Sequence, residues 1–335
     1  MTDSTSALPL RPQEYHHFLR TPRARWWKGA LLALSFLVLY LLVSLLLTVA
    51  AVAFDVATER VQVSSLVEGR LTMSPALMLA SNLAPALMIP ASMLLQWGFF
   101  GQRPRWLHSV HGGFRWRLLV RAAIFVVPLW AVYVVLTTLL LPQGPTGAFT
   151  AESVALLVII VVTTPLQAAG EEYGARGLLT RAAGSWVADR RVALVVATGF
   201  SAVLFTVAHG AGDPWLISYY FVFAVALSLV TWRTGGLEVA VLVHGVNNLF
   251  LFVLAVSLGS DLSQTFDRRN GVAGPSMLIA MGMMALITIV VWWWAHRSGV
   301  VRFSRPLPPA PPTPPLPPLL RGGAPQDQKP LAWPE

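Results

Sequence analysis

The chain alternates long apolar runs with short polar connections. Eight runs stand out, at 27–53, 73–99, 118–141, 153–179, 192–209, 215–232, 237–259 and 275–295. A helix of about 20 apolar residues crosses a hydrocarbon core about 30 Å thick, and most of the runs reach this length. The pattern predicts an all-α, polytopic transmembrane helix bundle of about eight spans within 26–297, and therefore an integral membrane protein.

Basic residues fall in every second connection. The connections at 101–117 and 180–191 are rich in arginine, whereas 142–152 between them has no Lys or Arg. Connections that stay on the cytoplasmic side of a membrane carry an excess of these two residues. The alternation predicts that both termini are cytoplasmic, and we expect the plasma membrane to be the location.

The composition supports a membrane protein and narrows its chemistry. Hydrophobic residues make up 55% of the chain and charged residues 12%, and the mean hydropathy is +0.63. These values exclude an ordinary soluble domain. The net charge of +9 lies in connections between apolar runs, so membrane lipids, and not nucleic acid, are the predicted partners. The absence of Cys excludes disulfides, thiolate metal sites and Cys nucleophiles.

The two ends of the chain differ from the spans. Residues 1–25 are polar and end basic, which predicts a cytoplasmic lead-in. Residues 298–335 form a tail that contains PLPPAPPTPPLPPLL at 306–320. Because proline fixes φ and lacks an amide proton, this tail is predicted to be cytoplasmic and either disordered or polyproline-like. A plain extended tail is favoured over a ligand for an SH3-like domain.

Two glutamates and an arginine interrupt the fourth apolar run, in GEEYGARGLL at 170–179. A charged residue at mid-bilayer costs about 2.5–3.5 kcal/mol, so such residues usually have a function. Glu172 and Arg176 are four apart and share a helix face, whereas Glu171 lies about 100° away. Arg176 is predicted to neutralise Glu172, which leaves Glu171 available for chemistry. The alternative is that both glutamates cap a cluster of arginines.

Further polar residues interrupt later spans. His209 ends the fifth apolar run in FTVAH, and HGVNN in the seventh places His244 and Asn248 four apart on one helix face. A lone histidine in an apolar run is usually a hydrogen-bonded packing residue. Two histidines, an amide and a free carboxylate in three successive parts of one bundle favour a catalytic site.

At this point the sequence resembles a known family. E-E-x-x-x-R at 171–176, F-x-x-x-H at 205–209 and H-x-x-x-N at 244–248 match, in order, three motifs of the CPBP family. This family comprises the type 2 CAAX prenyl endopeptidases and bacteriocin-processing, Abi-like intramembrane proteases. The resemblance covers about 154–252, a four-span core.

The resemblance implies an intramembrane peptidase that cuts peptide bonds near the cytoplasmic face. It implies that Glu171 activates water with help from His209, and that His244 and Asn248 hold the oxyanion. Donors to a developing oxyanion each contribute about 100- to 1000-fold in rate. Glu172 and Arg176 would support the site without reacting. The expected substrate is a peptide or protein at the membrane, lipidated substrates included.

Several alternatives stay open. A zinc-dependent form of the same protease would use Glu171, His209 and His244 as ligands, with one open position for water. We favour the metal-free glutamate mechanism, without a cofactor. A non-catalytic scaffold that binds a membrane partner would keep the same pocket. A carrier that uses the buried carboxylates lacks the support of an inverted repeat.

The depth of His209 tests the predicted site. A span that begins at 192 on the inside places His209 at its outer end, about 27 Å away. Glu171 and His244 are expected nearer the cytoplasmic side. The site can therefore converge only if a helix is tilted or set deeper in the membrane, and we predict that it converges.

Overall fold

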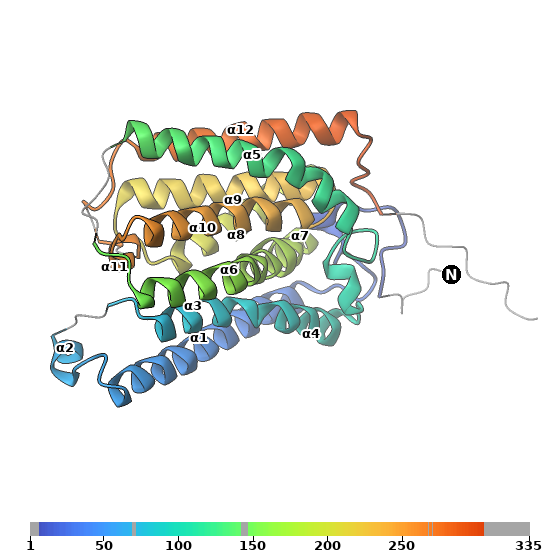
Figure 1. The fold of residues 1–335 in the computed structure, drawn as a ribbon. Coiled ribbons are helices and arrows are strands. Elements are labelled where there is room, and N and C mark those ends of the chain that lie inside the picture. The colour runs from blue at the N-terminus through green and yellow to red at the C-terminus, as the bar shows by residue number, and fades with distance from the viewer. Residues whose placement is uncertain (1–6, 69–71, 142–146, 267, 270, 305–335) are drawn as a thin grey trace, which may run out of the picture.

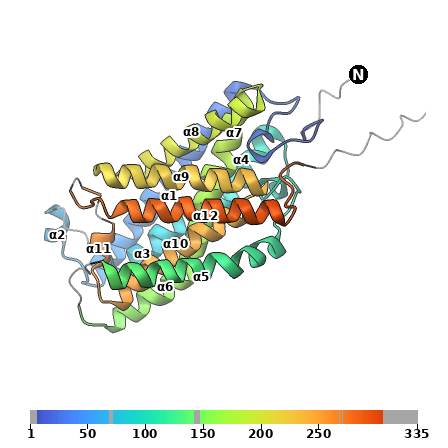
Figure 2. The same ribbon diagram turned by 90° about the horizontal axis from the view of Figure 1, so that it is seen from above.

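The computed structural model describes residues 7–304, apart from 69–71, 142–146, 267 and 270. The described chain is a bundle of helices that run roughly alongside one another (Figures 1 and 2), and it contains no β-strand. Eight helical segments of the described chain are long and apolar enough to cross a membrane. The predicted all-α bundle of eight spans is confirmed.

The helices are α1 (Trp26–Ala57), α2 (Val63–Val67), α3 (Pro75–Ala86), α4 (Met88–Phe100), α5 (Trp116–Leu140), α6 (Ala151–Glu172), α7 (Thr180–Trp186), α8 (Arg190–Ala208), α9 (Pro214–Thr234), α10 (Glu238–Ser257), α11 (Leu262–Thr265) and α12 (Met277–Arg297). Two short 3-10 helices, η1 (Tyr15–His17) and η2 (Pro104–Leu107), lie outside the spans. A π-helix, η3 (Tyr173–Leu179), joins α6 to α7.

The second span is broken where α3 meets α4. Pro90 has no amide proton to donate to the turn before it, and Pro85 lies in the last turn of α3, so two helical hydrogen bonds are missing near the break. The backbone of Pro85 lies against Gly170 of α6, at a distance that leaves no room for a Cβ atom. Glycine at this position therefore lets α3 and α6 pack closely, beside the two glutamates.

The fourth span is longer than predicted. Its helix does not end near Leu179 but continues through η3 and α7 to Trp186. The connection predicted at 180–191 is therefore shorter than expected, because α7 ends at Trp186 and α8 begins at Arg190. Arg181 is fully buried, donates to Oε1 of Gln96 at 2.8 Å and lies 4.2 Å from the ring centre of Tyr15. Protein groups thus replace the water that a loop arginine would have had.

The polar lead-in packs against the bundle. Tyr15, Phe18 and Leu19 are almost completely buried. Nε2 of His16 lies 3.0 Å from the carbonyl of Arg190 at the start of α8, and burial lowers the pKa of His16 to about 4. The lead-in, including η1, is therefore part of the folded structure. The proline-rich segment predicted at 306–320 lies outside the described residues.

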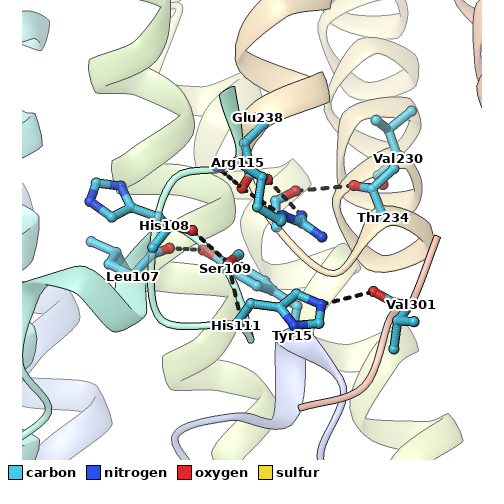
Figure 3. A network of polar contacts seen from close by, with 12 residues as sticks. Tyr15, Leu107, His108, Ser109, His111, Arg115, Val230, Thr234, Glu238 and Val301 are labelled. Carbon is cyan, nitrogen blue, oxygen red and sulfur yellow. Dashed lines mark hydrogen bonds and ion pairs between the residues drawn. The ribbon is translucent and has the colours of Figure 1, made fainter. Parts of the chain in front are cut away.

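The bundle has two distinct ends (Figure 1). The lead-in, η2, the start of α8 and the residues after α12 lie at one end, called here the basic end. The short helices α2 and α11 lie at the opposite end, called here the α11 end, with the connection from α8 to α9. A polar network crosses the basic end (Figure 3), where Arg115 makes a two-pronged ion pair with Glu238 at 2.7 and 2.8 Å.

Candidate active site

Glu172, the last residue of α6, is held in a fully buried ion pair. Nη1 of Arg176 donates to Oε1 of Glu172 at 3.0 Å, and neither side chain is exposed. The guanidinium also lies 4.2 Å from the ring centre of Phe205. The predicted pairing of Glu172 with Arg176 is thus present. It spans the junction between α6 and the π-helix, a type of distortion that is frequent at functional sites.

His244 connects this ion pair to Glu171. Its Nδ1 lies 2.7 Å from Oε1 of Glu172, and its Nε2 lies 3.6 Å from Oε2 of Glu171. Because an ionised carboxylate only accepts hydrogen bonds, Nδ1 carries a proton. Nε2 is the nitrogen left to face Glu171, and it can donate only when it is protonated too.

His209 caps the C-terminus of α8. Its Nδ1 donates to the carbonyl of Phe205 at 2.8 Å, since a carbonyl oxygen can only accept. In the neutral ring, Nε2 is therefore an acceptor. The ring lies 4.0 Å from the ring centre of Tyr220 and 4.4 Å from that of Phe205, which fixes its position.

A chain of hydrogen bonds between side chains ends at Glu171. Gln167, one turn earlier in α6, donates to Oε1 of Glu171 at 2.5 Å and accepts from Nδ2 of Asn248 at 3.0 Å. Oδ1 of Asn248 accepts from Asn247 at 2.9 Å, and Asn247 accepts from the hydroxyl of Tyr219 at 3.3 Å. Each donor therefore points toward the next group on the way to the carboxylate. Three helices, α6, α9 and α10, are tied together by this chain.

The four predicted catalytic residues line one cavity of about 680 Å³. Glu171, His209, His244 and Asn248 come from α6, the end of α8 and α10, and Gln167 lies among them. Aromatic side chains make much of the wall, including Tyr40, Trp130, Tyr133, Phe205 and Phe223. The side chain of Glu171 is 18% exposed, while that of Glu172 is not exposed at all. The two neighbouring carboxylates thus face different surroundings, as their spacing predicted.

The depth of Glu171 explains the convergence. The fourth span continues from Glu171 to Trp186, about 20 Å of helix, so Glu171 lies in the middle of its span and not at the basic end. The cavity extends from there to His209 at the end of α8. The sequence placed Glu171 nearer the cytoplasmic side than His209, and the two meet because the helix continues past Leu179 and leaves Glu171 in mid-span.

The zinc alternative was tested against the geometry. Among the described residues, no group of three His, Asp or Glu side chains is placed to hold one metal ion. Glu171, His209 and His244 are included in that statement. Nδ1 of both histidines is bonded, to Phe205 and Glu172, which leaves Nε2 as the available nitrogen and by itself neither favours nor opposes a metal. The three residues of the predicted ligand set do not fit zinc as they lie in this structure.

The comparison with known families agrees with the motifs. Residues 152–250 match the family model described as type II CAAX prenyl endopeptidase Rce1-like. This part of the chain is similar to that family, and it makes up less than half of the chain. The Rce1-like core runs from the first turn of α6 into α10 and holds all three motifs, so the resemblance drawn from them is confirmed. No curated protein and no solved structure matches the chain. The eight apolar helices support an integral membrane protein, and residues 152–250 are similar to a family of peptidases.

Sequence reasoning missed part of the site. Gln167 lies four residues before Glu171 on the same helix face, a spacing that could have revealed it. Asn247 is visible in HGVNN, but it lies on a different helix face from His244 and Asn248, so the four-residue spacing does not include it. Tyr219 carries no signal in the sequence, since only the packing of α9 against α10 brings it to Asn247.

Proposed function

We propose that this protein is a metal-free intramembrane endopeptidase in which Glu171 is the general base. The observation that carries the proposal is the meeting of Glu171, His209, His244 and Asn248 on one cavity. Oε2 of Glu171 is buried and has no hydrogen-bond partner among the described residues. A carboxylate oxygen in this position can accept a proton from a water molecule in the cavity.

The reaction follows from these positions. Glu171 takes one proton from water as the water oxygen bonds to the peptide carbonyl carbon. The carbonyl oxygen becomes an oxyanion, which accepts from the second Nδ2 hydrogen of Asn248 and from Nε2–H of protonated His244. When the C–N bond breaks, the proton on Glu171 passes to the departing nitrogen. The products are a carboxylic acid and an amine.

The other groups hold these atoms in place. Nε2 of His209 accepts the remaining hydrogen of the attacking water. Gln167 orients both the base and Asn248 through its two hydrogen bonds. Glu172 and Arg176 orient His244 without touching the substrate. A correctly placed base and its partners contribute mostly through geometry.

The substrate is proposed only as a class. The family description names CAAX prenyl endopeptidases, and we propose for this chain a peptide or protein held at the membrane. The aromatic walls of the cavity suit an apolar segment next to the scissile bond. A lipidated peptide is one member of this class.

The test compares peptide termini in membranes that carry the wild type, Glu171→Gln or Glu152→Gln. Glu152 is an exposed glutamate in the first turn of the same helix, so its substitution is the matched control. We expect termini that wild type and Glu152→Gln produce and Glu171→Gln does not. Identical termini in all three membranes, with cellular function preserved, would instead establish the non-catalytic scaffold.

Metal independence has its own test. With the wild-type protein purified in detergent, cleavage of a peptide that spans a mapped junction should continue in EDTA and in 1,10-phenanthroline. Loss of cleavage in the chelators and its recovery with zinc would refute the metal-free mechanism and leave the peptidase assignment standing.

A further inference from the structure

The catalytic cavity lies toward the α11 end of the bundle. Most of its lining residues in four spans lie toward this end, at 130–137 of α5, 204–209 at the end of α8, 216–223 of α9 and 244–254 of α10, whereas Phe36 of α1 and Leu179 of η3 line it on the other side of Glu171. Phe266, Arg268 and Met277, in the connection before α12 and at its start, also line the cavity. The cavity therefore reaches from Glu171 in mid-span to the connections at the α11 end.

Arg268 helps to form the wall at that end. Its guanidinium lies 5.3 Å from the ring centre of Tyr220 and 5.9 Å from that of Phe266. Its carbonyl accepts from Gly212 at 2.7 Å, which ties the connection before α12 to the one after α8. Two connections of the α11 end thus frame this part of the cavity, beside His209.

The opposite end holds a network of polar contacts between the lead-in, the connection that contains η2 and the start of α10 (Figure 3). Glu238, in the first turn of α10, is fully buried and paired with Arg115. The hydroxyl of Tyr15 donates to the carbonyl of Leu107 at 2.5 Å, and the amide of Leu237 donates to the carbonyl of His108 at 2.9 Å.

Apolar side chains fill the space between this network and the site. Leu107 and Leu237 are fully buried in one cluster with Tyr15, Phe18, Val110 and Tyr173. Tyr173 directly follows Glu172 in the chain. This cluster lies between the network at the basic end and the glutamates, and no residue of the network lines the cavity.

The charges assign the two ends to sides of a membrane. The described connections of the α11 end contain three basic residues, Arg60, Arg268 and Arg269, among several acidic ones. The basic end holds many more. They include Arg20, Arg23, Arg25, Lys28, Arg103, Arg105, Arg115, Arg117, Arg190, Arg191, Arg297 and Arg302. The basic end is the one that the positive-inside rule places in the cytoplasm.

We infer that the catalytic cavity opens to the non-cytoplasmic side of the membrane. Its substrate, which rests on the proposed function, is then a membrane-anchored peptide whose scissile segment emerges on that side. The sequence predicted both cytoplasmic termini and cleavage near the cytoplasmic face. These two predictions conflict in this fold, because the described connections that line the cavity, at His209, Phe266 and Arg268, lie at the end opposite the termini. The charge pattern of this chain supports the first, whereas the second came from resemblance alone.

The natural absence of Cys makes the orientation directly measurable. Val272→Cys and Val301→Cys are identical substitutions at exposed positions on the two sides of α12, with 46% and 54% of the residue exposed. Cells that express either variant are treated with a membrane-impermeant maleimide before and after permeabilisation. We expect Val272→Cys to react in intact cells and Val301→Cys only after permeabilisation. The reverse pattern, or equal labelling of both variants in intact cells, would overturn the inference.

Orientation and catalysis can fail separately in this design. Maleimide labelling needs no activity, so it holds or fails regardless of what Glu171→Gln does to peptide termini. The substrate class is read from the mapped termini that depend on Glu171. Junctions in segments on the non-cytoplasmic side are expected. Junctions in cytoplasmic segments would refute the substrate class while leaving the peptidase in place.

Discussion

Two buried clusters of charged side chains share helix α10 and differ in how completely they are paired. At its first turn, both oxygens of Glu238 are bonded to Arg115, and apolar side chains fill the surroundings. Two turns later, His244 lies between Glu171 and Glu172, each of which keeps one oxygen without a hydrogen-bond partner in the described chain. The second cluster borders a cavity, whereas the residues of the first do not line it.

The comparison shows why burial of a charge is a weak sign of function. Both clusters would be expensive to place in a bilayer, and both satisfy the usual expectation that buried charges are paired. Only the cluster at Glu171 combines an unpartnered acceptor, donors from several helices and room for a substrate. The cluster at Glu238 joins the lead-in, η2 and α10 into a closed end, a structural task.

The largest expected effect is on turnover at Glu171. Glu171→Gln keeps the shape and loses the base, so cleavage of a peptide at a mapped junction should fall by about 100- to 10,000-fold. The thermal midpoint in detergent should stay close to that of the wild type, because the side chain borders a cavity. A variant that loses activity together with its cooperative unfolding transition would make Glu171 resemble Glu238, and the contrast between the clusters would disappear.

Asn248 tests the oxyanion role on the same cavity. Asn248→Ala removes an amide donor and should lower kcat by about 100- to 1000-fold. Asn247→Ala, which removes the adjacent amide and one link of the hydrogen-bond chain, should cost less. Equal losses in the two variants would indicate that the chain as a whole, and not the donor at Asn248, matters for catalysis.

Glu238 should show the opposite behaviour. Glu238→Gln breaks the ion pair with Arg115 and should lower the free energy of unfolding by about 3 kcal/mol. This is the lower end of the range for a broken buried pair, since the Arg115 side chain keeps 21% exposure. Thermal unfolding measures the loss, and cleavage per folded molecule should match the wild type. A large loss of kcat in the folded fraction would place Glu238 in the catalytic machinery, contrary to the geometry.

Gln167 should give a moderate effect that separates positioning from support of the fold. Gln167→Leu leaves both Glu171 and Asn248 without their shared partner and should reduce kcat by about 10-fold with little change in KM, because a small misplacement of reacting groups is costly. A merely structural role predicts a lower thermal midpoint and an unchanged kcat per folded molecule. The neighbouring substitution Leu166→Ala, at a residue that is 49% exposed on another face of α6, is the control and should leave kcat unchanged.

The smallest effect is on the stability of the basic end and on how that stability depends on pH. Burial lowers the pKa of His16 to about 4, while the unfolded ring titrates near its ordinary value of about 6.5. Between these values the unfolded state binds more protons, so stability falls as the pH drops from 6.5 to 4. At pH 5.5 the expected loss is about 1.4 kcal/mol, and it approaches its limit of about 3 kcal/mol only near pH 4. Thermal midpoints of wild type and His16→Asn across this range measure it, and a slope that the variant retains would assign the effect to other groups.

Much of the bundle could be predicted because a hydrocarbon core imposes length and polarity on every span. The end of the fourth span could not, since Arg181 reads as a loop cation until Gln96 and Tyr15 are seen to enclose it. The packing of the lead-in was missed for a similar reason. His16 and Glu14 are polar residues whose partners, Arg190 and Arg302, lie far away in the sequence.

The candidate site shows the same division. Motif spacing predicted the pairing of Glu172 with Arg176 and the separate direction of Glu171. The contact of His244 with both glutamates depends on how α10 crosses α6, which no local pattern specifies. Gln167 was within reach of the helical spacing rule, while the link from Asn247 to Tyr219 required the packed bundle.

The π-helix at Tyr173–Leu179 sets how residues on its two sides are oriented, the glutamates on one side and Arg181 at the basic end on the other. Its wider turn holds a residue more than an α-helical turn would. If the same residues formed a regular α-helix instead, everything beyond them would be rotated by about 100° relative to α6. Arg181 would then turn away from Gln96 and Tyr15. One inserted residue in the middle of the longest span therefore keeps the carboxylates in their cavity while it points the distal arginine at the N-terminal segment.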